Sequence, residues 1–274
     1  MAAAEEWLQR FSAPVALAFC SMSGRQFNEL LQKRWGACFP ESVFVQRDGI
    51  SKGFVKRADN DALGKKLAVI AANEFIEDLC EELCVKSVSF NELMACGAGA
   101  LEWPAFRAAF DYYFPVQIAI NTLANYLPHG DARIETISKA RKRAEKTFEN
   151  ASGWLEGLCA ELTGYPQKFA QAMLEEEIVR ATRGGELPSI SVLEDRWKLS
   201  CVRHARGIQE IHVGNKAAQI EKRVVGNAGE SIRGTVAFPG FARGVARVIH
   251  DKPLEKTFND GEVLVSGMTR PDFV

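Results

Sequence analysis

The chain has 274 residues, 47% of them hydrophobic and 25% charged, which is the composition of a globular protein with room for about two domains. Its net charge of −1 at pH 7 gives no electrostatic basis for binding nucleic acid or an anionic membrane surface. No apolar run approaches the ~20 residues of a membrane span, and residues 1–7 lack the basic region of a signal peptide, so we expect a cytoplasmic protein with no nucleic-acid or membrane partner.

Seven cysteines are scattered through apolar surroundings, and their odd number is typical of free thiols in a reducing compartment. Cys80 and Cys84 lie one helical turn apart and could contact a common ligand. Because no second pair with zinc-like spacing accompanies them, we expect no metal site.

The first sixty residues indicate mixed structure. The apolar run 15–20 predicts a short strand, and apolar residues at helical spacing predict a helix over 24–35. Residues 42–47 and 53–55 flank the turn signal Asp48-Gly49, so we expect a small β-hairpin there.

The next part of the chain reads as helical. Apolar spacing predicts one amphipathic helix over 61–84, and Ser89, with a glutamate three residues later, matches the capping box that opens a short helix. Glycines at 97–99 break the pattern, Pro104 suits the first turn of a further helix, and Pro115 should kink or split that helix. The aromatic residues of this last helix either pack against neighbouring helices or form the wall of a substrate groove: Phe106, Phe110, Tyr113 and Phe114.

A long, highly charged helix is expected over 132–162, with Asp131 as its cap. Its basic cluster, residues 139–146, has two interpretations. One is a solvated helix face with i,i+4 pairs such as Arg141–Glu145. The other is a phosphate-binding surface. We favour the solvated face.

Further helices are expected after this one. Residues 167–182 form one that ends at Gly184-Gly185, and Ser191 is a candidate N-cap for the next. Residues 216–225 fit either a strand or a helix, and the small, polar, glycine-rich segment 226–231 has the composition of a flexible linker.

The hydrophobic residues of the segment 197–214 follow neither a helical nor a strand period. It contains His204 and His212, eight residues apart, with Arg203 and Arg206 nearby. We interpret these histidines as surface or core side chains, with a catalytic role as the alternative.

The C-terminal stretch predicts a strand, a tight turn, a second strand, a loop and a third strand. Pro239-Gly240 marks the tight turn. Alternation over 245–250 predicts the second strand. The turn signal at 259–261 precedes a short apolar strand over 262–265.

Two residue runs in this stretch resemble the start of the phosphohistidine swivelling domain of phosphoenolpyruvate-utilising enzymes, the family of phosphoenolpyruvate synthase, pyruvate phosphate dikinase and rifampicin phosphotransferase. The first run follows the pattern G-x-x-A-x-x-G-x-x-x-G-x-A/V-x-V and consists of Gly234, Ala237, Gly240, Gly244, Ala246 and Val248. The second follows G-x-I/V-L-V-x-x-x-T-x-P-D and consists of Gly261, Val263, Leu264, Val265, Thr269, Pro271 and Asp272. A weaker likeness to the segment that precedes this domain extends the matched region to roughly 170–274 and consists of Glu177-Ile178, residues 185–188, Leu193 and Arg196.

The resemblance implies a phosphotransferase. In the family, the histidine of a Gly-Gly-x-x-x-His segment carries a phosphoryl group between ATP, with Mg, and an acceptor. That segment follows the second run by some tens of residues, so the resemblance places the phosphohistidine beyond Val274 and makes none of the four histidines of this chain catalytic. It also implies an ATP-binding domain or subunit supplied elsewhere and a small-molecule phosphoryl acceptor.

The same resemblance assigns roles to residues near the C-terminus. Thr269 and Arg270 would contribute donors to the oxygens of the phosphoryl group, and the alternative role of Thr269 is to cap the following helix. Conformational roles in the hinge and the turns fall to glycines: Gly226, Gly229, Gly234, Gly240 and Gly244.

The expected fold class is therefore α+β. A mainly helical domain over 1–225, with the small hairpin inside it, is followed by a glycine-rich hinge over 226–231 and by the first β-strands of a β/α swivelling domain over 232–274. The expected function is a part in the phosphotransferase reaction described above. The alternative is a non-catalytic helical interaction module with a vestigial swivelling domain.

Overall fold

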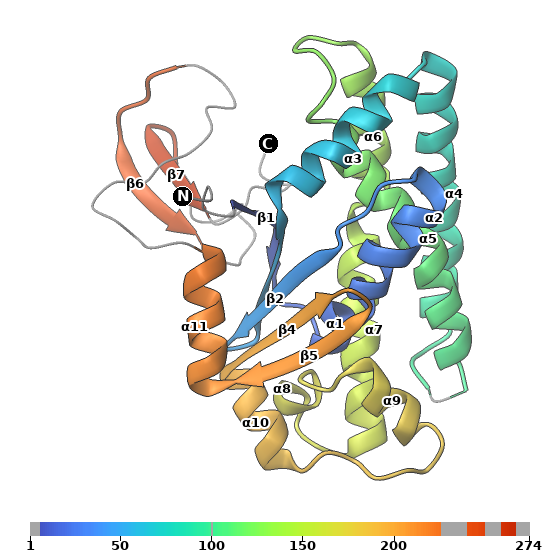
Figure 1. Cartoon of the computed structure of the whole chain (residues 1–274), viewed down its shortest axis with the longest axis vertical. Coiled ribbons are helices and arrows are strands. Elements are labelled where there is room, and N and C mark those ends of the chain that lie inside the picture. Colours follow the sequence, from blue (N-terminus) through green and yellow to red (C-terminus); the bar gives the residue numbers. More distant parts are fainter. Residues whose placement is uncertain (1–5, 100, 226–239, 250–258, 267–274) are drawn as a thin grey trace.

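The computed structural model describes residues 6–99, 101–225, 240–249 and 259–266. It shows a mixed fold of helices and strands, which confirms the expected α+β class. A five-stranded sheet has the strand order β1-β3-β2-β4-β5, and two further strands, β6 and β7, form a sheet of their own (Figure 1).

The five-stranded sheet is antiparallel throughout. Its strands are β1 (Trp7–Ala13), β2 (Glu41–Arg47), β3 (Ile50–Lys56), β4 (Leu199–Ala205) and β5 (Ile208–Val213). The β2–β3 hairpin was expected, and both of its turn residues have positive φ, 50° at Asp48 and 82° at Gly49, as a two-residue type I′ turn requires. A second hairpin, β4–β5, turns at Arg206 and Gly207 in the same way, with φ values of 53° and 77°.

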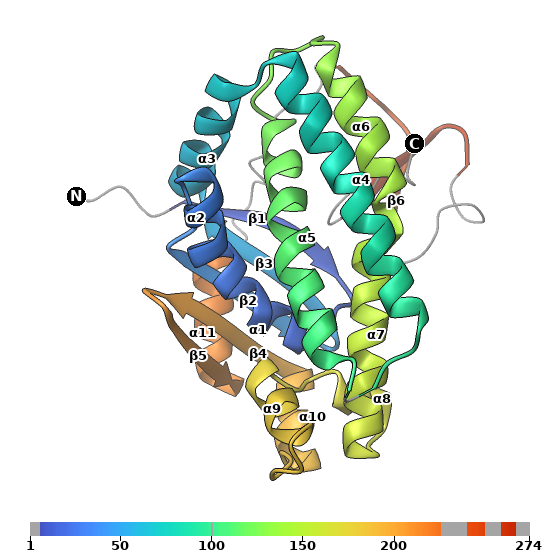
Figure 2. The same cartoon turned by 90° about the vertical axis from the view of Figure 1, so that its right-hand side faces the viewer.

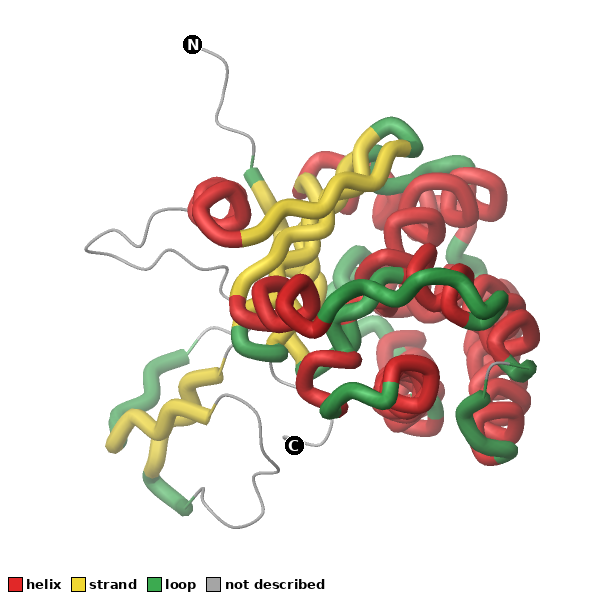
Figure 3. Tube along the Cα trace, turned by 90° about the horizontal axis from the view of Figure 1, so that it is seen from below, coloured by secondary structure: helices red, strands yellow, loops and turns green. Residues whose placement is uncertain are grey.

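Both faces of this sheet are covered, which the alternation along β2 explains. Phe44 packs into the large core on the side of most helices, whereas Val43 and Val45 belong to a smaller apolar cluster on the opposite side. That smaller cluster also contains Ala217 and Val224 of α11 (Gly214–Val225). Figure 3 shows α11 on one side of the sheet and the other helices on the opposite side.

The main helical layer lies on the opposite side of the sheet from α11 and consists of four helices, the last two of which follow one another end to end in Figure 2. They are α4 (Asn73–Ala95), α5 (Trp103–Leu123), α6 (Arg133–Arg143) and α7 (Glu145–Thr163). Further helices complete the domain: α1 (Leu17–Arg25), the π-helical turn η1 (Gln26–Leu30), α2 (Leu31–Trp35), α3 (Arg57–Ile70), α8 (Gln167–Ala170), α9 (Glu175–Ala181) and α10 (Ile190–Lys198).

The strand expected at 15–20 is wrong, because this segment begins helix α1. Every residue over 17–24 is buried, and α1 packs between the sheet and the helices α7 and α9. An apolar run that is buried on all sides does not reveal its period, so a buried helix and a buried strand look alike in the sequence.

Three of the expected helices are broken where no proline or glycine marks the break. The helix expected over 61–84 divides at Ala71, whose carbonyl accepts a hydrogen bond from Arg133 Nη1. The long helix divides at Ala144, which has φ −91° and ψ 1° and is buried. The helix expected over 167–182 divides into α8 and α9. Tertiary contacts decide these breaks, and local propensity does not show them.

Helix starts were predicted with mixed success. Pro104 lies in the first turn of α5 as expected, but α5 continues through Pro115 as one helix. Ser89 lies inside α4 and does not cap a helix. The N-cap of α10 is Ser189, whose Oγ accepts the Val192 N–H at 3.4 Å, and the prediction of Ser191 was wrong by two residues.

The strands β6 (Val245–Ile249) and β7 (Glu262–Ser266) confirm the two strands expected there, and they pair in parallel. Gly244 is needed for a close approach, because an added Cβ would lie 2.0 Å from the Gly261 carbonyl oxygen. At Gly240 an added Cβ would meet nothing within 4 Å, and the turn expected there includes Pro239, which lies outside the described residues. Gly226, Gly229, Gly234, Thr269 and Arg270 lie outside the described residues.

Candidate functional site

The histidines show no catalytic arrangement within the described residues. His129 is exposed in a loop. His204 is buried, its Nε2 lies 3.3 Å from the Cys20 carbonyl oxygen, and its ring packs edge-on against Phe44. Burial lowers the pKa of His204 to about 4, so its imidazole is neutral at pH 7. His204 is a core side chain.

The cysteine pair noted in the sequence lies on α4. Burial raises the pKa of the Cys80 thiol to about 11, which leaves it protonated and unreactive at pH 7. In the part of the chain that the structure describes, no three His, Cys, Asp or Glu side chains gather where they could hold a metal ion.

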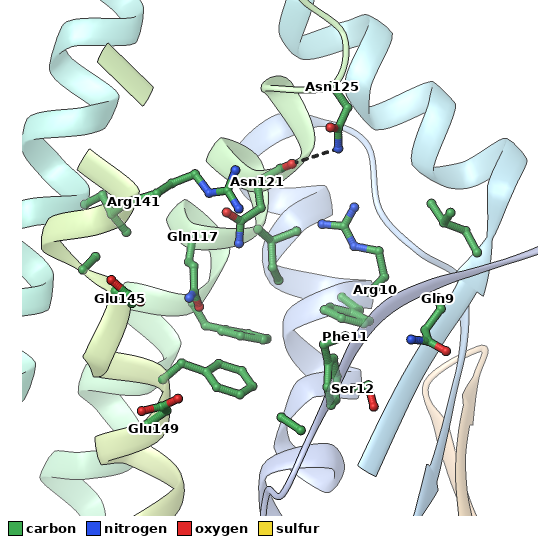
Figure 4. Close-up of a pocket in the computed structure, with 18 residues that line it drawn as sticks. Gln9, Arg10, Phe11, Ser12, Gln117, Asn121, Asn125, Arg141, Glu145 and Glu149 are labelled. Atoms are coloured by element: carbon green, nitrogen blue, oxygen red, sulfur yellow. Dashed lines mark hydrogen bonds between the residues drawn. The ribbon is translucent and has the colours of Figure 1, made fainter. Parts of the chain in front are cut away.

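A pocket between β1 and the helical layer is the strongest candidate for a binding site. Its volume of about 440 Å³ is in the range of small-molecule sites. Residues from β1, η1 and helices α4 to α7 line it, together with Asn125 just after α5 (Figure 4).

One part of the lining is apolar and largely aromatic. Phe11 of β1 and Phe148 of α7 meet edge to face, with ring centroids 5.9 Å apart. Phe27 comes from the π-helical turn η1 and Phe114 from α5, and these two rings stack at 6.1 Å. The other apolar contributors are Leu8, Ala13, Leu83, Ile118 and Ala144.

The rest of the lining is polar, and its character is set by two arginines and a group of amides. Figure 4 shows Arg141 and Arg10 reaching into the pocket from opposite sides, with Asn121 between them. The remaining polar side chains are Gln9, Ser12, Gln117, Asn125, Glu145 and Glu149.

Arg10 enters the pocket because of a β-bulge. Gln9 pairs with Phe54 and Phe11 pairs with Gly53, so Arg10 is an extra residue in β1. Such an insertion changes the direction in which a side chain points. Arg10 and the neighbouring Phe11 consequently both face the helical layer, where Arg10 donates hydrogen bonds to Asn60 Oδ1 at 2.6 Å and to Thr122 Oγ1 at 3.0 Å.

The partners of Arg10 are neutral. Within the described residues Arg10 makes no ion pair. The nearest carboxylate of this network, on Asp61, accepts a hydrogen bond from Tyr126, which in turn accepts one from Asn60. Burial, together with the positive charge of Arg141, lowers the pKa of Arg10 to about 10, so the guanidinium is still charged at pH 7.

Arg141 lies in the last turn of α6, just before the break at Ala144. The expected ion pair between Arg141 and Glu145 does not form, and across the described residues Arg141 has neither an ion pair nor a hydrogen bond. Burial lowers the pKa of its guanidinium. The other basic residues of the 139–146 cluster are exposed, so the expected solvated face holds for all but Arg141: Lys139, Lys142, Arg143 and Lys146.

This arrangement suits an anion. A guanidinium binds carboxylate or phosphate oxygens through its fork of N–H donors, and a desolvated ionisable group that faces a cleft is a functional-site candidate. Two such groups face one pocket here. The amides of Gln117 and Asn121 add donors and acceptors for uncharged parts of a ligand.

Only some residues of this pocket could be recognised in the sequence. The basic cluster contains Arg141, and the aromatic series contains Phe114, but Phe106 and Phe110 are fully packed and line no part of it. Arg10 was missed, although an arginine between Leu8 and Phe11 in a partly apolar stretch is a usable signal.

No protein-family model, curated protein or solved structure matches the chain. None of the helices over 6–99 and 101–225 is both long and apolar enough to cross a membrane.

Proposed function

We propose that this chain is part of a phosphotransferase of the phosphoenolpyruvate synthase-like type, and that its pocket holds the small-molecule acceptor. The phosphoryl group would come from ATP or phosphoenolpyruvate and pass through a histidine that lies outside these 274 residues. The observation that carries the proposal is the pair Arg10 and Arg141, two guanidinium groups that face one pocket and form no ion pair with a carboxylate of the described residues. The two residue runs that resemble the swivelling domain support it from the sequence.

In the proposed phosphoryl transfer, the protein mainly positions the reacting groups and stabilises charge. An acceptor hydroxyl oxygen bonds to phosphorus while the P–N bond of the phosphohistidine breaks, and the electron pair of that bond returns to the imidazole nitrogen. The hydroxyl proton ends on the imidazole, directly or by way of a carboxylate such as Glu145 in the pocket lining. Arg10 and Arg141 would stabilise the negative charge on the phosphoryl oxygens.

ATP and Mg would bind to a nucleotide-binding domain or subunit supplied elsewhere. Thr269 and Arg270 would hold the phosphoryl group on the swivelling domain, as the resemblance implies. The domain carrying the histidine must then move between the two sites, which agrees with a glycine-rich hinge at 226–231.

A non-catalytic interaction module is the second candidate, and exposed apolar side chains on two adjacent helices favour it. Val85 and Val88 of α4 are 58% and 57% exposed, and Tyr112 of α5 is 67% exposed. Lys86 connects the two helices through the Tyr112 carbonyl, at 2.9 Å. A protein partner would cover this surface.

The test is phosphohistidine formation in the complete natural gene product. The protein is incubated with ATP, Mg and its nucleotide-binding domain or subunit, and intact mass is measured before and after acid treatment. We expect a mass gain of one phosphoryl group that is lost in acid and stable in alkali. If the complete protein stays unmodified while a partner protein binds over Val85 and Val88, the interaction module replaces the phosphotransferase.

A further inference from the structure

The pocket has two ends of different character. In Figure 4 its upper end is formed by Arg141, Arg10 and the amides of Asn121 and Asn125, and its lower end by Phe11 on one side and Glu149 on the other. The aromatic cluster of Phe11, Phe27, Phe114 and Phe148 forms the apolar surface. A ligand that fills the pocket therefore needs an anionic group at one end and an apolar body next to it.

The charge at the basic end indicates which anion fits. Arg10 and Arg141 supply two positive charges, and neither is neutralised by a carboxylate of the described chain. A phosphate monoester carries nearly two negative charges at pH 7, because its second pKa is about 6, whereas a carboxylate carries one. A phosphate group also offers three oxygens to the two guanidinium forks.

The two arginines differ in how firmly their guanidinium groups are held. Arg10 is already held by Asn60 and Thr122, so its guanidinium is fixed before the ligand arrives. Arg141 makes no such bonds to the part of the chain that the structure describes, so its guanidinium can move to meet the anion. Because the Arg10 guanidinium is preorganised, the entropy cost of binding is lower. The carboxylates of Glu145 and Glu149 disfavour an anion along α7 and so favour the orientation with the phosphate between the arginines.

We infer that the pocket binds an organic phosphate monoester with an apolar ring-containing body, which makes the acceptor an alcohol with such a body. The identification of this ester as the reaction product rests on the proposed function. The binding itself does not, because it follows from the pocket lining alone.

Isothermal titration calorimetry on the 274-residue chain tests this inference with four probes. Phenyl phosphate has both the dianion and the ring, inorganic phosphate lacks the ring, benzoate has one charge, and benzyl alcohol has none. We expect phenyl phosphate to bind at least about tenfold more tightly than each of the others, a difference of about 1.4 kcal/mol. If inorganic phosphate bound as tightly as phenyl phosphate, the inferred apolar body of the ligand would be wrong. If benzyl alcohol bound as tightly, the inferred anionic group would be wrong.

The variant Arg141→Gln tests the residue assignment. Loss of a charged hydrogen-bonding group should weaken phenyl phosphate binding about tenfold or more. Since Arg141 has no partner in the described chain and its charge opposes that of Arg10, the variant without ligand should unfold at a temperature no lower than that of the parent chain. Lys142→Gln is the matched control, with the same change of charge at an exposed neighbour, and should bind like the parent chain. Equal losses in both variants would overturn the assignment.

The phosphotransferase proposal and the pocket assignment can be refuted independently of each other. Binding of phenyl phosphate that depends on Arg141, in a protein whose complete form makes no phosphohistidine, would refute the phosphotransferase and leave the pocket assignment intact. Phosphohistidine formation without such binding would refute the pocket assignment alone.

Discussion

At the scale of single residues, His204 shows how one buried ring constrains its surroundings. Its Nε2 lies 3.3 Å from the Cys20 carbonyl oxygen on α1. A Cβ added at Gly24 would lie 1.9 Å from His204 Nδ1, so α1 needs a glycine where it crosses this ring. The imidazole is therefore buried in its neutral form, and desolvation opposes its protonation.

This packing predicts a pH dependence of stability. The pKa of His204 is about 4 in the folded chain and 6.5 in the unfolded chain. As the pH falls below 6.5 the unfolded state binds the proton first, so the free energy of unfolding decreases between pH 6.5 and 4. From pH 7 to pH 5 the loss should be about 2 kcal/mol.

Urea unfolding at pH 7 and pH 5 measures this loss. His204→Gln removes the titrating ring and should show a smaller loss between the two pH values than the parent chain. His129→Gln, which changes an exposed loop histidine, should keep the full loss. The same loss in His204→Gln and the parent chain would show that other groups cause it.

At the scale of elements, one buried ion pair joins α9 to α10. Arg196 Nη1 and Nη2 donate to the two carboxylate oxygens of Glu177 at 2.7 and 2.9 Å, and Glu177 also accepts the Leu174 N–H at 2.9 Å. Ile178 and Leu193 beside them are fully buried. These are residues of the weaker sequence likeness, and their contacts give a structural reason for those residue types at those positions.

Glu177→Gln should destabilise the chain by about 3 kcal/mol or more, because it leaves the Arg196 charge buried and uncompensated. Glu135→Gln is the control. It breaks an i,i+4 pair with Lys139 in which both side chains are at least 70% exposed, and such pairs contribute less than about 1 kcal/mol. Chemical denaturation of both variants gives the comparison. A similar stability in the two would contradict the role of Glu177.

The elements that could be predicted from the sequence are those with local signals. The Asp48-Gly49 turn revealed the β2–β3 hairpin, and the strands β6 and β7 followed from turn residues and alternation. The pairing of β2 with β4 could not be predicted, because these strands lie more than a hundred residues apart and β4 has no clear period.

The pocket was only partly predictable for the same reason. Arg141 lies in a recognisable basic cluster. The break between α6 and α7 at Ala144, after which α7 continues the pocket lining, is not marked by a glycine or proline in the sequence. The direction of the Arg10 side chain depends on a bulge in the pairing of β1 with β3. A bulge is a property of two paired strands, so the sequence of β1 alone does not show it.

At the scale of the whole molecule, the sheet gives the pocket a rigid wall. β1 is an edge strand of the five-stranded sheet, and its helical face meets α5, α6 and α7 at the pocket. Sites built on strands and helices hold their side chains more precisely than sites on loops. The pocket is thus suited to bind one ligand in one orientation.

The central claim, that Arg10 and Arg141 together bind the anion, is tested most directly by nuclear magnetic resonance of the arginine side chains. Phenyl phosphate is titrated into the ¹⁵N-labelled chain, and the Nε–Hε signals are assigned by substitution of single arginines. We expect the signals of Arg10 and Arg141 to shift together with one affinity, while that of the exposed Arg143 on the same helix stays in place. Unchanged signals from both pocket arginines, or an equal shift of Arg143, would contradict the account.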